Sequence, residues 1–169
     1  MIDTELYKAK ILYPFQQSTI DAILEELLAN SENFNLLFQL PTGGGKTVIF
    51  SEIVRRYISK YNKKVLVLTH RIELSKQTSN MLDEFGVPNK IINSTANLDD
   101  QDNYHCFVAM VETLNNRLND GLDISDVGLV IIDEAHYNSF RKLFKHFEKC
   151  IILGVTATPL SLNIQLPMY

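Results

Sequence analysis

The sequence has no apolar stretch of membrane-spanning length, only two cysteines among 169 residues, and no surplus of basic residues. A run of about 18 or more apolar residues would predict a transmembrane helix, and the polar segment from Met1 to Lys10 does not resemble a secretion signal. Cys106 and Cys150 lie in apolar segments without metal-ligand spacing, so we expect buried reduced thiols, with a disulfide as the alternative. These absences argue against a membrane protein and predict a cytoplasmic location.

The charge balance is slightly acidic, with 16 Lys and Arg against 20 Asp and Glu and a formal net charge of -4. This balance argues against wrapping nucleic acid by bulk electrostatics, although single lysines and backbone amides can still hold phosphates. Arg55, Arg56, Lys60, Lys63 and Lys64 form a basic cluster. Because the cluster lies near the end of a predicted helix, we expect it to be solvated and to complement the helix dipole rather than to bind nucleic acid.

The order of apolar patterns predicts one α/β domain over residues 1–169, without repeats or an internal linker. A chain of this length should bury about 70% of the surface of its unfolded state. Short, continuous apolar runs alternate with amphipathic helical stripes, as in a mostly parallel sheet covered on both faces. The predicted strands are 35–40, 64–69, 90–93, 105–110, 127–133 and 150–155, and the helical stripes span 20–28, 50–58, 74–85 and 140–147.

Two polar clusters each close an apolar run: Pro41 to Thr47, which is rich in glycine, and Asp133 to His136. A glycine-rich turn before a helix directs successive backbone N–H groups at one point, where a polyphosphate fits. Lys46 adds a mobile positive charge for the outer phosphates. The hydroxyl of Thr47 and the carboxylate of Asp133 suit a shared magnesium ion, which leaves Glu134 to orient or deprotonate a water. The pair of clusters therefore predicts a Mg-nucleotide site.

Each cluster also has a purely structural interpretation. Residues 43–47 could form an ordinary glycine-rich turn, and the acidic pair Asp133 and Glu134 could cap a helix. A strand before the glycines, a helix after them and an acidic strand tip downstream favour nucleotide binding.

The chain resembles superfamily 2 helicases in the order and spacing of six segments. These are Tyr13-Pro14-Phe15-Gln16-Gln17, Gly43 to Thr47, Leu68 to Leu74, Val111 to Leu114, Asp133 to His136 and Thr156-Ala157-Thr158. The nearest subgroup is the phage-type and type III restriction res-subunit-type DNA helicases and translocases. The resemblance implies a RecA-like P-loop NTPase lobe, a three-layer sandwich with a Q-motif-like helix in residues 1–33 and a core with motifs I, Ia, Ic, II and III in residues 34–160. A second motor domain is absent from the chain.

The same resemblance implies a role for each matching position. Gln16 would read the adenine edge, since a side-chain amide carries both a donor and an acceptor. Phosphate would be bound by Thr42, Gly43, Gly44, Gly45, Lys46 and Thr47, and Mg²⁺ by Thr47 and Asp133. The catalytic residues would be Lys46, Asp133, Glu134 and His136. Nucleic acid would be contacted by Thr69, Arg71 and Thr113, and the two lobes would be coupled through Thr156 and Thr158. The chain departs from the family at Tyr13, where an arginine is usual, at Leu40, where the general phosphate-loop pattern has Gly or Ala, and at Glu112, where glutamine is frequent.

The sequence thus predicts the N-terminal motor lobe of an ATP-dependent DNA helicase or translocase, with ATP and Mg²⁺ as ligands. The expected partners are nucleic acid, with DNA favoured over RNA, and a second lobe of the same full-length protein. No Lys or Arg occurs between Pro159 and Tyr169, so the arginines that assist hydrolysis in this superfamily would come from the second lobe, and the chain alone should bind Mg-nucleotide weakly and hydrolyse it slowly. The alternatives are a non-catalytic nucleotide-dependent binding module and, last, a small-molecule kinase.

Overall fold

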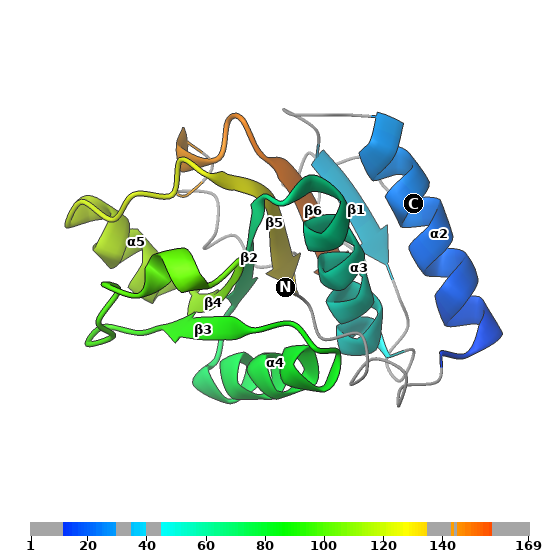
Figure 1. Cartoon of the computed structure of the whole chain (residues 1–169), viewed down its shortest axis with the longest axis horizontal. Helices are drawn as coiled ribbons and strands as arrows, with labels where there is room; N and C mark the ends of the chain where they lie inside the picture. Colours follow the sequence, from blue (N-terminus) through cyan, green and yellow to red (C-terminus); the bar gives the residue numbers. More distant parts are fainter. Residues whose placement is uncertain (1–11, 30–34, 40–44, 135–142, 144, 157–169) are drawn as a thin grey trace.

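The computed structural model describes residues 12–29, 35–39, 45–134, 143 and 145–156 (Figure 1). Its strands are β1 (Asn35–Gln39), β2 (Lys64–Thr69), β3 (Asn89–Ile92), β4 (Cys106–Met110), β5 (Val127–Asp133) and β6 (Ile151–Thr156). Its helices are α2 (Pro14–Ala29), α3 (Lys46–Tyr61), α4 (Ile72–Glu84) and α5 (Val111–Asn119), with a short 3-10 helix η1 (Gln101–Asn103). The predicted strands are therefore confirmed to within about one residue at each end.

The strands form one parallel six-stranded sheet in the order β1-β6-β5-β2-β4-β3. The strands are almost continuously apolar because both faces of the sheet are covered: every residue of β5 and of β6 is buried. The α/β class with a parallel central sheet is confirmed, and the edge position of the strand around Ile91 agrees with its partial burial.

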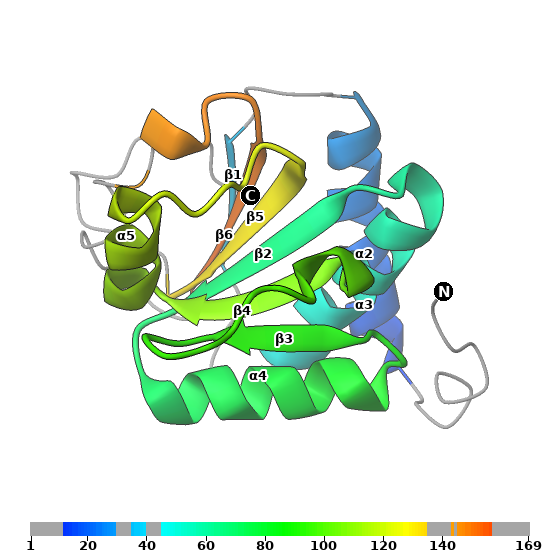
Figure 2. The same ribbon diagram turned by 60° about the vertical axis from the view of Figure 1, so that its left-hand side comes forward.

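Alternation along each strand divides the core into two clusters. On the face that we call the α3 face, Val65, Val67, Leu129 and Ile131 pack against α2, α3 and α4. On the α5 face, Leu66, Leu68, Val130 and Ile132 pack against α5 and against Leu143 and Phe147. Figures 1 and 2 show α3 and α5 on opposite sides of the sheet.

The helix boundaries follow local chemistry. Pro14 opens α2, because a missing N–H is tolerated in the first turn. The helices α4 and α5 end just before Gly86 and Gly121, whose φ values of 72° and 97° lie in the left-handed region that glycine adopts easily. The nine-residue α5 was not predicted as a helix. Half of the stripe predicted over 140–147 lies outside the described residues, and the described half contains 3-10 rather than α-helical residues.

All six strands point the same way, so their carboxyl ends meet at one edge of the sheet. This arrangement brings three residues to that edge: the last residue of β5, the last residue of β6, and the first residue of α3, the helix that follows β1. The strand β6 lies between β1 and β5. Cys106 and Cys150 are both buried and free of disulfides, as predicted. None of the helices in the described part of the chain is long and apolar enough to cross a membrane.

Candidate nucleotide site

Lys46 lies beside both acidic residues that close β5. Its Nζ atom is 3.1 Å from Asp133 Oδ1 and donates a hydrogen bond to Glu134 Oε1. Lys46 comes after β1 in the chain, whereas Asp133 is the last residue of β5 and Glu134 follows it. Only β6 lies between β1 and β5, a separation of about 10 Å at ordinary strand spacing. A lysine side chain can span that gap. The two clusters, 88 positions apart in sequence, therefore converge at one place.

The environment of Asp133 suits a cation. Its side chain is only 3% exposed, and Oδ1, although within ion-pair range of Lys46, accepts no hydrogen bond of proper geometry. A buried carboxylate oxygen with unused acceptor capacity is costly in a protein interior unless a positive charge faces it. The described residues contain no group of three or more His, Cys, Asp or Glu side chains that could hold a metal. This donor set fits Mg²⁺, which commonly takes one or two protein ligands and completes its shell with phosphate and water.

Glu134 occupies an unusual backbone conformation, with φ at 58°. Few residues other than glycine adopt this region, and such outliers collect at functional sites. The turn places the Glu134 carboxylate, 20% exposed, beside the Lys46 ammonium, 24% exposed. Both groups are thus reachable from solvent, unlike Asp133.

Gln16 lies against the phosphate loop. It is the third residue of α2, and its Oε1 accepts a hydrogen bond from the backbone N–H of Tyr13 at 3.0 Å, as in one half of a capping box. A Cβ placed on Gly45 would stand 2.4 Å from Gln16 Nε2. Since Gly45 also has φ of 74°, only glycine fits there, and the start of α2 packs directly against the start of α3.

Thr156 is fully buried at the end of β6, where its strand pairs with β1 on one side and β5 on the other. Gln39 is its register partner on β1, and Val155 pairs with Asp133 on β5. The predicted position of this strand between the two phosphate-site strands is confirmed.

The three residues predicted to contact nucleic acid differ in accessibility. The Thr69 hydroxyl is buried and lies 2.6 Å from the Ser75 hydroxyl, a partner that the sequence did not single out. Arg71, the N-terminal cap of α4, is exposed, and Thr113 is half-buried in the first turn of α5. Of the three residues, Arg71 is the exposed one.

Five predicted site residues lie outside the described part of the chain. They are Thr42, Gly43, Gly44, His136 and Thr158. Their roles stay predictions.

A parallel sheet with a phosphate-loop lysine and an acidic strand tip at its carboxyl edge defines the class of this protein as the N-terminal RecA-like lobe of superfamily 2 helicases. The chain belongs to the family described as type III restriction enzyme, res subunit, whose model matches residues 9–161.

Relatives and solved structures agree with this assignment. The putative ATP-dependent helicase IRC3 of Saccharomyces cerevisiae is 34% identical over 168 residues, which cover 90% of this chain and 24% of that protein. The ATP-dependent DNA helicase mph1 of Neurospora crassa is 31% identical over 176 residues, covering 94% of this chain and 15% of that protein. The helicase domain of Pyrococcus furiosus Hef superposes with a TM-score of 0.68 at 27% identity, over 85% of this chain and 35% of that one. The chain thus spans a quarter or less of these curated relatives.

Proposed function

We propose that this chain is the N-terminal motor lobe of an ATP-dependent DNA helicase or translocase, which binds Mg-ATP and contributes to its hydrolysis. The observation that carries the proposal is the convergence of Lys46 with Asp133 and Glu134 at the carboxyl edge of the sheet. The names of the relatives support ATP use and, for mph1, DNA. Substrate contact would involve exposed groups at the same edge, with Arg71 foremost, and a second lobe of the same protein would complete the site.

The chemistry follows from the contacts of Lys46. Without nucleotide, its ammonium is shared between two carboxylates. The β- and γ-phosphates of ATP are stronger competitors because they carry more negative charge, so their arrival draws the ammonium away and releases the Glu134 carboxylate. That carboxylate then orients a water whose oxygen attacks the γ-phosphorus. The bond to the β–γ bridging oxygen breaks, the water proton passes to Glu134, and ADP and phosphate are left.

Asp133 and the Thr47 hydroxyl would hold Mg²⁺. The ion, when bound, neutralises negative charge that develops on the phosphate oxygens. The role of Asp133 is to keep a fixed, buried acceptor at the strand tip. Thr156, buried on the strand between, is placed to sense changes on both sides, and a role in coupling to the second lobe is part of this proposal.

The test compares Glu134→Gln and Lys46→Ala in the full-length protein. Glu134→Gln should keep ATP affinity and lower strand-stimulated turnover by about 10² to 10⁴, the usual worth of a positioned general base. Lys46→Ala should weaken ATP binding itself, by about 10- to 150-fold, because a charge-assisted contact of about 1.5–3 kcal/mol is lost. Calorimetry gives the affinity, and phosphate release gives the turnover.

Glu148→Gln is the matched control, because the side chain of Glu148 is exposed and Glu148 is not among the residues proposed to bind nucleotide or metal. Turnover of Glu134→Gln equal to that of the wild type would remove Glu134 from the mechanism. A full-length protein that binds ATP but shows no strand-stimulated hydrolysis would instead support the non-catalytic binding module.

A further inference from the structure

The end of strand β2 and the start of helix α4 are joined by a buried hydrogen bond between two hydroxyl groups. Thr69 is the last residue of β2, and Ser75 is the fourth residue of α4. Thr69 Oγ1 and Ser75 Oγ are 2.6 Å apart, and the two residues are 0% and 2% exposed. A bond between hydroxyls at this distance is well formed, and because both groups are buried, water does not compete for it.

Both hydroxyls also face the backbone carbonyl of Arg71, the residue directly before α4. Thr69 Oγ1 and Ser75 Oγ each lie 3.4 Å from the Arg71 oxygen, which also accepts a hydrogen bond from the Ser75 backbone N–H at 3.1 Å. The two hydroxyls carry two hydrogens, so one forms the bond between them and the other is available to this carbonyl. The three residues therefore close one turn over residues 69–75.

The bond between Thr69 and Ser75 takes the place of an ordinary helix cap. The side chain of a Ser, Thr, Asp or Asn usually caps the N-terminus of a helix. The cap position of α4 is instead held by Arg71, whose side chain makes no cap hydrogen bond and whose backbone is extended, with φ at -134° and ψ at 146°. The Thr69–Ser75 bond therefore supplies the link between strand and helix that a capping side chain would otherwise provide.

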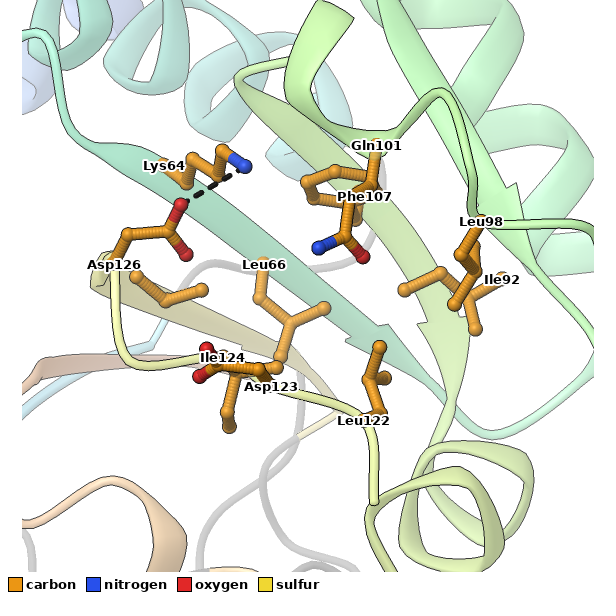
Figure 3. Close-up of a pocket in the computed structure, with 11 residues that line it drawn as sticks. Lys64, Leu66, Ile92, Leu98, Gln101, Phe107, Leu122, Asp123, Ile124 and Asp126 are labelled. Carbon is orange, nitrogen blue, oxygen red and sulfur yellow. Dashed lines mark ion pairs between the residues drawn. The ribbon is translucent and has the colours of Figure 1, made fainter. Parts of the chain in front are cut away.

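The strand that carries Thr69 is fixed at both ends. Strand β2 lies between β5 and β4, and Thr69 pairs in register with Met110. At the first residue of the strand, Lys64 forms an ion pair with Asp126 at 2.9 Å (Figure 3). The cavity beside this ion pair has a volume of about 20 Å³, room for about one water molecule, so the side chains there are closely packed. Thr69 is thus a fixed point, and the exposed Arg71 lies two residues beyond it.

The burial of Thr69 argues against direct contact with nucleic acid, the role that the family resemblance implies for it. A phosphate oxygen can reach the Thr69 hydroxyl only if the bond to Ser75 opens and the residue becomes exposed. Arg71 is exposed and always charged, so it can meet a phosphate without such a change. Phosphate contacts set the position of a strand on a protein, and they depend on where each cation is held.

We propose that Thr69 and Ser75 are positioning residues: their buried hydrogen bond fixes the turn that presents Arg71 to a phosphate of single-stranded DNA, and neither hydroxyl touches the DNA. The inference rests on the proposed function, in which Arg71 contacts the substrate. Without the bond, DNA binding has to order the turn, so the affinity falls. Ser75 lies outside the segments that resemble helicase motifs, so an effect of Ser75 on DNA binding is specific to this inference.

The test measures the affinity of the full-length protein for a fluorescein-labelled single-stranded oligothymidine by fluorescence anisotropy, over a series of salt concentrations. Arg71→Ala should weaken binding about tenfold and make the slope of log K against log salt shallower by about 0.7, the value of one phosphate contact to a single strand. Thr69→Val and Ser75→Ala each break the buried bond, and each should weaken binding about two- to tenfold with a shallower slope. A general loss of stability would not change the slope for the protein that remains folded.

Two further variants control for the substitution itself. Thr69→Ser keeps the hydroxyl, so it should restore the affinity and the salt slope of the wild type. Thr78→Val makes the same change as Thr69→Val at another buried residue of α4, which is 2% exposed, and should leave both quantities unchanged.

A double-mutant cycle separates positioning from direct contact. In the Arg71→Ala protein, Thr69→Val should have no further effect, because no guanidinium is left to position. Combining Thr69→Val with Ser75→Ala should weaken binding no more than either change alone, because both remove the same bond. A further loss from Thr69→Val in the Arg71→Ala protein would show that Thr69 itself touches the DNA and would overturn the inference.

The remaining outcomes distinguish the inference from the proposed function. If Arg71→Ala weakens binding but Ser75→Ala binds as the wild type does, the positioning role is overturned and the proposed function stands. A wild-type protein that binds no oligothymidine, or an Arg71→Ala variant that binds as tightly as the wild type, would overturn the proposed DNA contact and the inference with it.

Discussion

Among the residues that the structure describes, the two faces of the sheet are covered by different elements. On the α3 face, three helices and a cluster that includes the fully buried Phe50 and Phe85 close over the strands. On the α5 face, the described cover consists of the nine-residue helix α5, a short turn that ends near Phe147, and loops. The helices on the α3 face carry Gln16 and Lys46 of the candidate nucleotide site.

The two faces also differ in which of them carries residues of the candidate nucleotide site. Lys46 and Gln16 lie in the first turns of two helices that pack on the α3 face and on each other. A rigid surrounding layer is the usual requirement for a catalytic group.

The largest effect that tests this comparison should come from matched Leu→Ala substitutions in the two layers. Leu82, near the end of α4, is fully buried on the α3 face, and Leu118, near the end of α5, is 9% exposed on the α5 face. Such truncations cost about 2–5 kcal/mol, with the value set by how well the site collapses. We expect Leu82→Ala near the upper limit and Leu118→Ala near the lower one in urea unfolding. Equal costs would mean that the two layers are equally well packed.

Much of this fold could be predicted because both faces of the strands are buried. Continuous runs such as Val127 to Asp133 are strong signals, and parallel strands bring their carboxyl ends together, so the meeting of Lys46 with Asp133 followed from the order of motifs. The helix α5 was missed because nine residues provide only about two and a half turns of apolar spacing. The roles proposed for the site residues stay predictions, since position alone does not show what a side chain binds.

The basic cluster was expected to be solvated and to lie near a helix end, which is confirmed for the exposed Lys60, in the last turn of α3, and for the exposed Lys63, but is wrong for the two arginines. Arg55 and Arg56 were expected to be solvated, but both donate hydrogen bonds to Glu52, whose side chain is fully buried. The spacings of three and four residues from Glu52 were the available signal. Lys64 pairs with Asp126, which is distant in sequence and adjacent only because β2 and β5 are neighbours. Charge pattern alone does not reveal which acidic partner faces the core.

An intermediate loss of free energy of unfolding is expected when the ion-pair network of Glu52, which lies between α3 and α2, is disrupted. Glu52 accepts hydrogen bonds from Arg55 Nη2 and Arg56 Nε, each at 2.7 Å, and Arg56 Nη1 reaches Asp21 on α2 at 3.1 Å. Glu52→Gln keeps the shape and removes the charge, so it should cost about 1.5–3 kcal/mol, the usual worth of hydrogen bonds to a charged group. Asp21→Asn, at a site that is 60% exposed, should cost about 0.2–1 kcal/mol. Urea unfolding measures both, and a larger loss for Asp21→Asn would show that the network is not organised around Glu52.

A further effect concerns two protonated groups, Tyr57 in the core cluster of the α3 face and Cys150 in that of the α5 face. Burial, followed by the charges of Cys150 and Tyr61, raises the pKa of Tyr57 from 10.0 to about 12. Burial raises the pKa of Cys150 from 9.0 to about 11, against an opposing influence of Lys63. The folded state therefore holds these protons more tightly than the unfolded state does. This contribution to stability is complete below pH 9 and is lost as the pH rises through the folded pKa values.

The free energy of unfolding should accordingly be flat between pH 7 and 8 with respect to these two groups and should fall from about pH 9 upward. Cys150→Ala should reduce the slope between about pH 9 and 11, and Tyr57→Phe should reduce it between about pH 10 and 12, because each variant removes one titrating group. Urea midpoints measured at pH 8, 9.5 and 11 separate the two contributions. If Tyr57→Phe leaves the slope unchanged while Cys150→Ala flattens it, the phenol on the α3 face is in contact with water, and the layer that covers it is thinner there than the packing of α3 implies.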